Sequence, residues 1–337
     1  MRSFTIRGPN MAGVEVVPDP VPDSHEAVIS VEAAGVCGTD FELYRGTMPY
    51  FGAGLATYPL QPGHEWCGVV VSIGSAVDPT WLGVRVVGDP IIGCAECQRC
   101  VAGRPHLCVD RYEVGVRNGW PGALAEKVRV PVRSLHRIPN GMSAHVGALI
   151  EPASNALRAV DACRMLEGAS VCIWGPGTLG LLAIQFARLR GAGAVDLVGK
   201  CGDGLDIATT LGVDMTYIGR PSGGREYDSV IDASNSPLVP GIALSCVKPG
   251  GIVSLLGIAD EPSLVDLRSA VLNDVTLVGL LSGSPSFAAT IDLVASGVVC
   301  TDPLIAEVIA LEELTEVLEG KRRSNHQAPK VLVDPRS

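Results

Sequence analysis

The sequence has few aromatic residues, little charge and no long apolar run. Aromatic residues make up 4% and charged residues 18% of the 337 positions, whereas hydrophobic residues make up 47%, which is typical of a folded chain rather than a disordered one. Because no stretch approaches about twenty uninterrupted apolar residues, we expect no membrane span. The net charge of −10 disfavours nucleic acid as a partner, since such binders need a basic patch.

A secretory signal is also missing from the start of the sequence. The first six residues, MRSFTI, contain no apolar h-region and are typical of a first strand. We therefore expect a cytoplasmic protein, in which cysteines bind metal or fill the core more often than they form disulfides. Of the eleven cysteines, seven are scattered and are expected to be mostly small buried hydrophobic residues. These seven are Cys37, Cys67, Cys163, Cys172, Cys201, Cys246 and Cys300.

Two kinds of sequence pattern follow one another along the chain, and its length alone favours two domains. Up to about residue 150, short alternating runs such as 27–31 and 68–73 predict half-buried antiparallel strands between turns. From about residue 169 strands and helices alternate, which predicts βαβ units and a parallel sheet. The expected strands are 170–174, 195–198, 229–233, 252–257 and 275–281, and the expected helices are 179–190, 205–211 and 286–296.

The remaining four cysteines lie close together, within fifteen residues of sequence. They are Cys94, Cys97, Cys100 and Cys108. Thiols at this spacing can surround a zinc ion tetrahedrally at little cost in loop closure. Since four protein ligands leave no open position for a substrate, the predicted zinc is structural. The alternatives are an iron–sulfur cluster, although nothing else in the sequence indicates electron transfer, and an incidental group of thiols.

Two other residues are candidates for an open, catalytic zinc site. Cys37 lies in the segment GVCGTD and His64 in PGHEW, both at junctions of strand and turn beside glycine, where a side chain can project into a cleft. Together with an acidic residue they would give three ligands and one open position. Glu65 and Glu151 are the acidic candidates, and Glu151 lies where the first domain leads into the second. The alternative for either glutamate is a solvated surface charge.

A glycine motif, Gly175-x-Gly177-x2-Gly180, follows the strand expected at 170–174 and opens the helix expected at 179–190. In this strand–turn–helix context the glycines let the backbone approach a pyrophosphate, and the helix N-terminus offers free N–H groups. The motif therefore predicts dinucleotide binding by Gly175, Gly177, Thr178, Leu179 and Gly180.

The end of the second strand of this unit indicates which dinucleotide binds. A carboxylate there would bond to the adenosine ribose of NAD and repel a 2′-phosphate. The sequence has Gly199 followed by Lys200 instead, which favours NADP(H) over NAD(H). The alternative is that Lys200 is only solvated and that Asp203 reaches the ribose.

The motifs occur in an order that resembles the zinc-containing medium-chain dehydrogenase/reductase family, which includes alcohol, sorbitol, threonine and glucose dehydrogenases. The resemblance rests on the CGTD segment at Cys37, the GHE segment at His64, the four cysteines, the Glu-Pro pair at 151–152 and the glycine motif. The segments LYRG at 43–46, PGHEW at 62–66 and VGD at 87–89 most resemble the polyol, sugar and cyclitol branch, including aminocyclitol dehydrogenases.

The family resemblance implies a fold and two sets of zinc ligands. The expected class is α/β: a GroES-like, mostly β catalytic domain at 1–153 with the zinc lobe at about 90–110, a Rossmann domain with a doubly wound parallel sheet at 154–295, and a return to the catalytic domain at 296–337. The implied catalytic-zinc ligands are Cys37, His64, Glu65 and Glu151, with Glu65 either a fourth ligand or one that exchanges with water or substrate. The implied structural-zinc ligands are Cys94, Cys97, Cys100 and Cys108.

The resemblance also implies roles near the substrate. Thr39 would hydrogen-bond the substrate oxygen and begin a proton relay through the cofactor ribose. Asp40 would orient His64 by accepting its second N–H. Glu42 stands where many relatives have a relay histidine. Four aromatic residues beside the expected pocket segments are expected either to line it or to pack in the core; they are Tyr50, Phe51, Trp66 and Trp120.

The function expected from these features is hydride transfer between NADP(H) and a secondary alcohol or ketone, with a polyol, sugar or cyclitol-type small molecule as substrate. Secondary metabolism is a setting that the branch suggests. One alternative is an imine, enone or other carbonyl reductase on the same scaffold, and another is a non-catalytic cofactor-binding homologue. The family also implies a homodimer or homotetramer.

Overall fold

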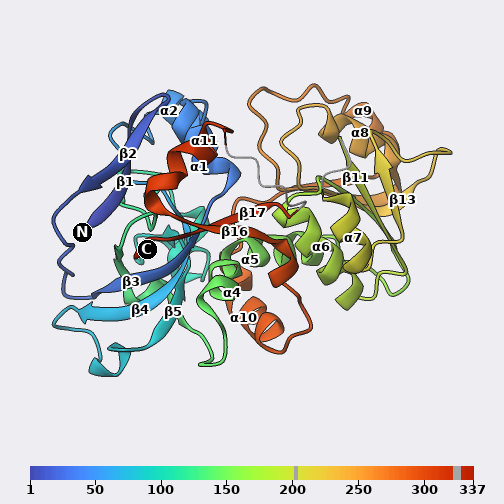
Figure 1. Ribbon diagram of the computed structural model, residues 1–337. Helices are drawn as coiled ribbons and strands as arrows, with labels where there is room; N and C mark the ends of the chain where they lie inside the picture. Colours follow the sequence, from blue (N-terminus) through green and yellow to red (C-terminus); the bar gives the residue numbers. More distant parts are fainter. Residues whose placement is uncertain (201–203, 322–327) are drawn as a thin grey trace.

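The computed structural model describes residues 1–200, 204–321 and 328–337. The chain forms two domains, each built around its own sheet, and both chain ends lie on the first of them (Figure 1). Asp203 and Cys201 lie outside the described residues, so the alternative ribose contact of Asp203 is not addressed by the structure. Among the described residues no helix has both the length and the apolar character needed to cross a bilayer.

The first domain is mostly β and carries a seven-stranded sheet in the order β16-β17-β3-β4-β5-β9, with β8 also paired to β3. The central strand β3 is buried over most of its length because β4, β8 and β17 all pair with it. The sheet strands are β3 (Glu26–Gly35), β4 (Glu65–Ile73), β5 (Arg85–Gly88), β8 (Lys127–Pro131), β9 (Leu135–Arg137), β16 (Ile305–Ala310) and β17 (Lys330–Asp334).

Short elements surround this sheet and supply most of the turns. Two hairpins flank it: β1 (Arg2–Gly8) with β2 (Met11–Val16), and β6 (Ile91–Ile92) with β7 (Tyr112–Glu113). The helices are α1 (Gly38–Arg45), α2 (Pro49–Gly52), α3 (Gln98–Val101), α4 (Ala144–Ala148) and α11 (Leu314–Leu318). The 3₁₀ turns are η1 (Pro79–Trp81), η2 (Pro105–Leu107), η3 (Val132–Ser134) and η6 (Leu311–Glu313).

The second domain has a six-stranded parallel sheet in the order β12-β11-β10-β13-β14-β15. The chain order reverses between β10 and β13, and in such sheets ligands bind outside the carboxyl ends of the strands at this point. The strands are β10 (Ser170–Trp174), β11 (Ala194–Gly199), β12 (Met215–Ile218), β13 (Tyr227–Asp232), β14 (Val247–Leu255) and β15 (Thr276–Gly279). The helices are α5 (Ile150–Ala162), α6 (Thr178–Leu189), α7 (Leu205–Thr210), α8 (Val239–Cys246), α9 (Arg268–Leu272) and α10 (Phe287–Ala295), with 3₁₀ turns η4 (Ser284–Ser286) and η5 (Asp302–Leu304).

One apolar core continues from the first domain into the second. It includes Ala33 of β3 and Leu332 of β17, and it reaches Leu157 of α5 and Leu181 of α6, all of which are almost fully buried. Helix α5 begins at the junction and supplies much of this core, as its position between the two sheets in Figure 1 indicates. The packing fixes the start of α5 against β3 and β4, where candidate site residues lie.

The fold class predicted from the sequence, a Rossmann sheet with a mostly β domain, is confirmed. The predicted strands and helices of the second domain all occur within a few residues of their expected bounds. Strand β12 and helices α5, α8 and α9 were not predicted. The last strand, β17, pairs antiparallel with β3, so the chain end completes the sheet of the first domain.

The scattered cysteines follow the core expectation with one clear exception. Cys67, Cys163, Cys172 and Cys246 are buried, and Cys37 is half-buried. Cys300 is exposed, so the prediction was wrong there. The reason is that Gln185 pins the backbone of this residue, donating to its carbonyl at 3.0 Å and accepting from its N–H at 2.7 Å, while the side chain faces outward.

Candidate active site and metal centres

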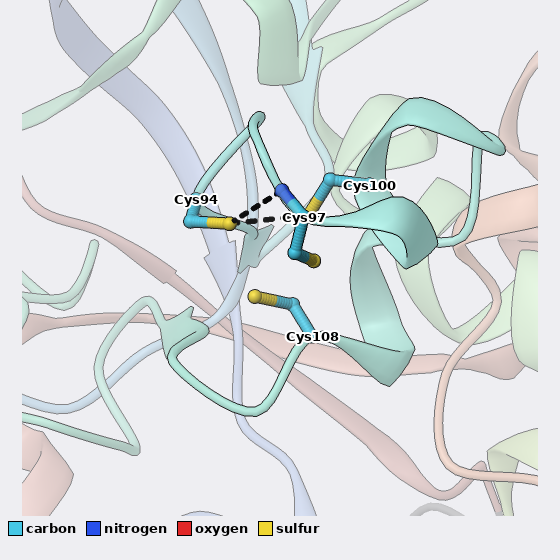
Figure 2. Close-up of side chains that lie close together, drawn as sticks. All are labelled: Cys94, Cys97, Cys100 and Cys108. Carbon is cyan, nitrogen blue, oxygen red and sulfur yellow. Dashed lines mark hydrogen bonds between the residues drawn. The ribbon is translucent and has the colours of Figure 1, made fainter.

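The structure brings the four clustered cysteines together at one point (Figure 2). Their sulfur atoms all lie within 4.8 Å of one another. The Sγ atoms of Cys94 and Cys100 are 3.9 Å apart, and the backbone N–H of Cys97 donates to Cys94 Sγ at 3.3 Å. Gly93 is required next to this group, because a Cβ there would lie 2.5 Å from Cys100 Sγ.

The donor set of this lobe suits a closed, four-coordinate zinc ion. All four donors are thiols, the ligand type that structural zinc sites use. Backbone N–H groups of Cys97 and Glu96 lower the pKa of Cys94 to about 7, whereas burial raises the pKa of Cys100 to about 12, so the protein by itself favours the thiolate at Cys94 but not at Cys100. Because four sulfur atoms converge, no coordination position is left for a substrate.

A second group of potential ligands forms where β3 and β4 lie side by side. Cys37 caps the N-terminus of α1 directly after β3, His64 precedes β4, and Glu65 is the first residue of β4. One donor atom from each of the three lies within 4.8 Å of the others. Residue Gly35 is paired with Glu65 across the strands, and a Cβ at Gly35 would overlap the Glu65 carboxylate. The local backbone is therefore built to admit this carboxylate.

Glu65 forms a buried ion pair with Lys330, a residue that was not predicted from the sequence. Lys330, the first residue of β17, places its Nζ 2.6 Å from Glu65 Oε2 and donates to the carbonyl of Val36 at 3.0 Å. The two charged side chains are only 3% and 1% exposed. In the sequence, Lys330 stands out only as a charged residue at the start of the apolar run KVLV. That it pairs with Glu65 could not be predicted, because the pair forms only once β17 lies beside β3.

Glu151 lies in the first turn of α5, near this group but not within it. Its carboxylate accepts a hydrogen bond from Asn155 Nδ2 at 2.9 Å. Burial raises the pKa of Glu151 to about 7, and the negative charge of Glu65 adds to the shift. Glu65 and Glu151 are both buried, so neither is a solvated surface charge.

Asp40 and His64 influence each other electrostatically, but no hydrogen bond joins them among the described residues. Asp40 is the third residue of α1, so its carboxylate reaches back and accepts from the backbone N–H of Cys37 at 2.8 Å. The other carboxylate oxygen, Oδ1, and His64 Nδ1 are buried without a hydrogen-bond partner. Capping of α1 thus uses one oxygen of Asp40 and leaves the other free to accept a hydrogen bond.

The second group carries an excess of buried negative charge. Burial disfavours the cationic form of His64, but the Cys37 thiol and the carboxylates of Asp40 and Glu151 outweigh it and raise the pKa of His64. Burial likewise raises the pKa of Asp40. Lys330 contacts the group through Glu65, so a thiol and the carboxylates of Asp40, Glu65 and Glu151 face one ammonium and the imidazole of His64. A divalent cation held by sulfur, nitrogen and oxygen ligands fits this donor set and its charge.

Thr39 and Glu42 both lie on α1, next to the second group, and both are half-buried. Burial raises the pKa of Glu42 to about 7, and the nearby carboxylates of Asp260 and Asp40 contribute. Asp260 belongs to the loop that follows β14, so carboxylates of the two domains approach each other here.

The four aromatic residues have different environments. Trp66 is 1% exposed and belongs to the core, so it does not line a pocket. The Tyr50 hydroxyl donates to Glu113 at 3.0 Å, and the Phe51 ring stacks on Tyr58. Trp120 borders a cavity of about 480 Å³ beside β1, but none of the predicted zinc ligands lines that cavity.

The glycine motif forms a tight turn between β10 and α6. Gly175 has a φ of 104° and a Cβ there would lie 2.7 Å from the Ala233 carbonyl oxygen. A Cβ at Gly180 would overlap the carbonyl oxygen of Gly175, so the helix can approach the strand only with glycine. Gly177 caps α6, and no heavy atom lies within 4 Å of the position its Cβ would take. The turn thus leaves open space at a helix N-terminus, and Thr178 and Leu179 begin that helix.

Gly199 and Lys200 end the neighbouring strand at the same edge of the sheet. Gly199 is the last residue of β11, and the Lys200 side chain is exposed. Strands β10 and β11 are parallel neighbours, so their carboxyl ends lie side by side. Beside the glycine turn, this edge of the sheet therefore has the exposed cation of Lys200, and the last position of β11 is a glycine rather than an acidic residue.

Comparison with known proteins places the chain in a family. Residues 23–140 match the alcohol dehydrogenase GroES-like domain, and residues 178–296 match the zinc-binding dehydrogenase domain. A sorbitol dehydrogenase from Bombyx mori is 29% identical over 333 residues, covering 93% of each chain.

Solved structures agree with this assignment. A zinc-binding dehydrogenase from Sinorhizobium meliloti 1021, bound to NADP, is 31% identical with a TM-score of 0.89 over 99% of each chain. An alcohol dehydrogenase from Escherichia coli CFT073, complexed with NADH, has a TM-score of 0.90 over 99% of each chain; at 24% identity it supports the fold alone. The chain therefore belongs to the zinc-dependent alcohol dehydrogenases of the medium-chain family, which combine a GroES-like domain with a Rossmann domain.

Proposed function

We propose that this enzyme transfers a hydride between NADP(H) and a secondary alcohol or ketone, and that the substrate is a polyol, sugar or cyclitol-type molecule. The observation that carries the proposal is the group formed by Cys37, His64 and Glu65, whose mixed donors and excess negative charge suit a catalytic zinc ion. The similarity to a sorbitol dehydrogenase supports the polyol part.

In this proposal Cys37, His64, Glu65 and Glu151 hold the catalytic zinc, with Glu65 shared between the metal and Lys330. When bound, zinc supplies Lewis-acid polarisation of the substrate oxygen, and the nicotinamide supplies or accepts the hydride. Lys330 holds the Glu65 carboxylate at 2.6 Å and so limits its approach to the metal. Asn155 holds the Glu151 carboxylate in the same way at 2.9 Å.

Thr39 is the proposed first proton acceptor from the substrate hydroxyl. It lies two residues after Cys37, in the first turn of α1. Glu42 lies one turn further along the same helix. Because burial raises the pKa of Glu42 to about 7, this carboxyl can exchange a proton near neutral pH.

The second zinc is proposed to be structural and held by Cys94, Cys97, Cys100 and Cys108. The proposed enzyme thus holds two zinc ions per chain, one in each group. Four thiols with no open position give this zinc a role in the fold of the lobe rather than in turnover.

The NADP(H) preference rests on Lys200 and Gly199. An exposed cation beside the glycine turn can pair with a 2′-phosphate, and the absence of a carboxylate at Gly199 removes the usual ribose acceptor of NAD. The related enzyme from Sinorhizobium meliloti binds NADP, which supports this assignment. The turn formed by Gly175, Gly177 and Gly180, with Thr178 and Leu179, is the proposed pyrophosphate site.

The test of the function is turnover of a panel of polyols, sugars, cyclitols and simple secondary alcohols with each cofactor. We expect oxidation of at least one polyhydroxy substrate and a higher kcat/KM with NADP. Activity restricted to enones or imines, or no turnover at all, would contradict the proposed reaction.

The preference for NADP(H) over NAD(H) is tested by a substitution of Lys200. Lys200→Met should raise the Kd of NADPH about tenfold and leave that of NADH unchanged, because only the former carries the 2′-phosphate. Lys248→Met is the matched control, since Lys248 is the second residue of β14, at the other end of the sheet, where it pairs with Asp228. Equal loss of both cofactors, or no loss of NADPH, would contradict the role of Lys200.

We also propose a homodimer or homotetramer in a reducing, cytoplasmic environment. Strand β15 is the last strand of its sheet, and α9 beside it exposes Val271 and Leu272 at 80% and 83%. An exposed apolar surface next to a sheet edge favours association. The ten described cysteines are all free, as expected of a reducing compartment. Light scattering coupled to gel filtration measures the assembly, and a monomer at micromolar concentration would contradict it.

A further inference from the structure

Four arginines close around the four-cysteine lobe, and each donates a hydrogen bond to one of its backbone carbonyls. We call Arg99, Arg111, Arg117 and Arg133 the arginine collar. Their acceptors belong to Cys108 or to peptides directly beside Cys94 and Cys108. The bonds are Arg99 Nη1 to Leu107 O at 2.6 Å, Arg111 Nη1 to Cys108 O at 3.2 Å, Arg117 Nη2 to Val109 O at 3.0 Å and Arg133 Nη2 to Gly93 O at 2.9 Å.

The lobe is cationic in a chain that is otherwise acidic. Residues 93–117 contain four arginines and three carboxylates, and Arg133 adds a fifth arginine from outside the segment. The whole chain, in contrast, has a net charge of −10. Positive charge is thus concentrated around the four thiols.

Two members of the collar are buried with too little negative charge. The side chains of Arg111 and Arg117 are 13% and 8% exposed. Both face the same carboxylate, Glu113, at 2.8 Å and 4.0 Å. The Nε of Arg117 is buried and has no hydrogen-bond partner. Since burial of an unpaired charge is costly, two guanidinium groups against one carboxylate need a further anion.

A zinc ion bound by four thiolates is such an anion. The ion brings two positive charges and the thiolates four negative ones, so the filled centre carries a formal charge of about −2. Building on the structural zinc of the proposed function, we propose that Arg111 and Arg117 are the counter-charge of this centre and slow the release of its metal. Neither residue ligates the metal; both act through the charge they place beside Cys108.

The alternative is that the two arginines only brace the loop. Arg117 also packs against the Tyr50 ring, with its guanidinium carbon 5.7 Å from the ring centroid, and Tyr50 donates to Glu113. A bracing role depends on the shape of the guanidinium group, whereas a counter-charge role depends on its charge. Substitution by lysine and by methionine separates the two.

The experiment measures zinc release to a chromophoric chelator in the full-length Cys37→Ser protein, so that the lobe is the remaining proposed zinc site. We expect Arg117→Met and Arg111→Met each to accelerate release about tenfold, and Arg117→Lys to stay within about threefold of the parent. Arg104→Met is the matched control, since Arg104 is an exposed arginine of the same lobe whose hydrogen bonds among the described residues are those of its backbone; it should release zinc at the parent rate.

Thermal unfolding of each variant, recorded in parallel, identifies variants that do not fold. If Arg117→Met does not fold, the release rate of Arg111→Met provides the test. Release at the parent rate from folded Arg117→Met and Arg111→Met would overturn the proposal, as would equal acceleration by Arg117→Lys or Arg104→Met. A parent protein with no zinc in the lobe would overturn the structural-zinc assignment itself, which separates the two failures.

Discussion

The two groups of metal-ligating residues are assembled in different ways. The four cysteines of the lobe lie within fifteen residues, on turns that need only local geometry to converge. Cys37, His64 and Glu65 lie at the ends of two neighbouring strands of the sheet, after β3 and at the start of β4. Glu151 comes from α5 and Lys330 from the last strand. A site built locally can be stable by itself, whereas a site built from distant elements reports the correct assembly of the whole domain.

Charge separates the two groups as well. The thiols of the lobe are surrounded by arginines that hydrogen-bond to its backbone, whereas the second group has several acidic side chains and one lysine. Under the proposed function, the arginines of the lobe would help to retain a closed anionic centre. The second group combines buried carboxylates with a thiol and an imidazole, donors that would suit a metal that accepts a substrate oxygen.

Loss of one lobe thiol is expected to have the largest effect on stability. Cys108→Ser removes a buried ligand, and because metal binding and folding of such a lobe are coupled, the free energy of unfolding should fall by about 4 kcal/mol. Urea unfolding with metal analysis of the same sample measures this. Cys300→Ser, which changes an exposed thiol, should behave as the parent. Full metal content and unchanged stability in Cys108→Ser would contradict a structural role for the lobe.

Removal of the buried lysine tests the second group. Lys330→Met leaves Glu65 buried without its ion-pair partner, which should cost about 3 kcal/mol in the metal-free protein. Added zinc should recover part of the loss, because it gives the carboxylate a new partner. Unfolding with and without a chelator measures both values. Lys248→Met breaks a half-exposed pair and should cost less than about 1 kcal/mol; an equal loss in both variants would argue against a special role for Lys330.

A smaller, pH-dependent effect is expected where the segment leading into the lobe meets the second domain. Asp89 accepts from Ile91 N–H and from the Ser284 hydroxyl at 3.0 Å, and burial raises its pKa to about 6. Because the folded-state pKa lies above the unfolded one, folding disfavours the carboxylate, and stability declines as pH rises from about 4 to about 6.

The matched variant for this effect is Asp89→Asn, which keeps the acceptor oxygen. It should equal the parent near pH 4 and exceed it by about 2 kcal/mol above pH 7. Unfolding curves across this range measure the difference. A variant less stable than the parent above pH 7 would show that the ionised carboxylate contributes more through its two hydrogen bonds than it loses through burial.

The sequence predicted those features that depend on local pattern. Strand and helix alternation after residue 169 predicted the Rossmann sheet, and the spacing of the lobe cysteines predicted their convergence. The glycine motif predicted a tight turn. The positive φ of Gly175 and the close approach of Gly180 to the Gly175 carbonyl confirm that turn. Each of these is decided within a few tens of residues.

Features that depend on distant pairing could not be predicted. Lys330 reaches Glu65 only because β17 returns to β3, a contact across 265 positions of sequence. The predicted orientation of His64 by Asp40 stays a prediction: Asp40 caps α1 with one carboxylate oxygen, and its other oxygen and His64 Nδ1 are buried without a hydrogen-bond partner. Trp66 was a possible pocket residue because it follows the GHE segment in the sequence. In the structure its ring is buried against Gly88 of the neighbouring strand β5.

The most direct test of two metal centres with separate tasks is zinc content and turnover in Cys37→Ser, measured on the same preparation as the parent. We expect about two zinc ions per chain in the parent and about one in the variant, with turnover reduced at least about a thousandfold and an unchanged unfolding midpoint in urea. A variant that keeps both metals and its activity would contradict two separate centres, and so would a variant that loses the metal of the lobe together with the metal of the second group.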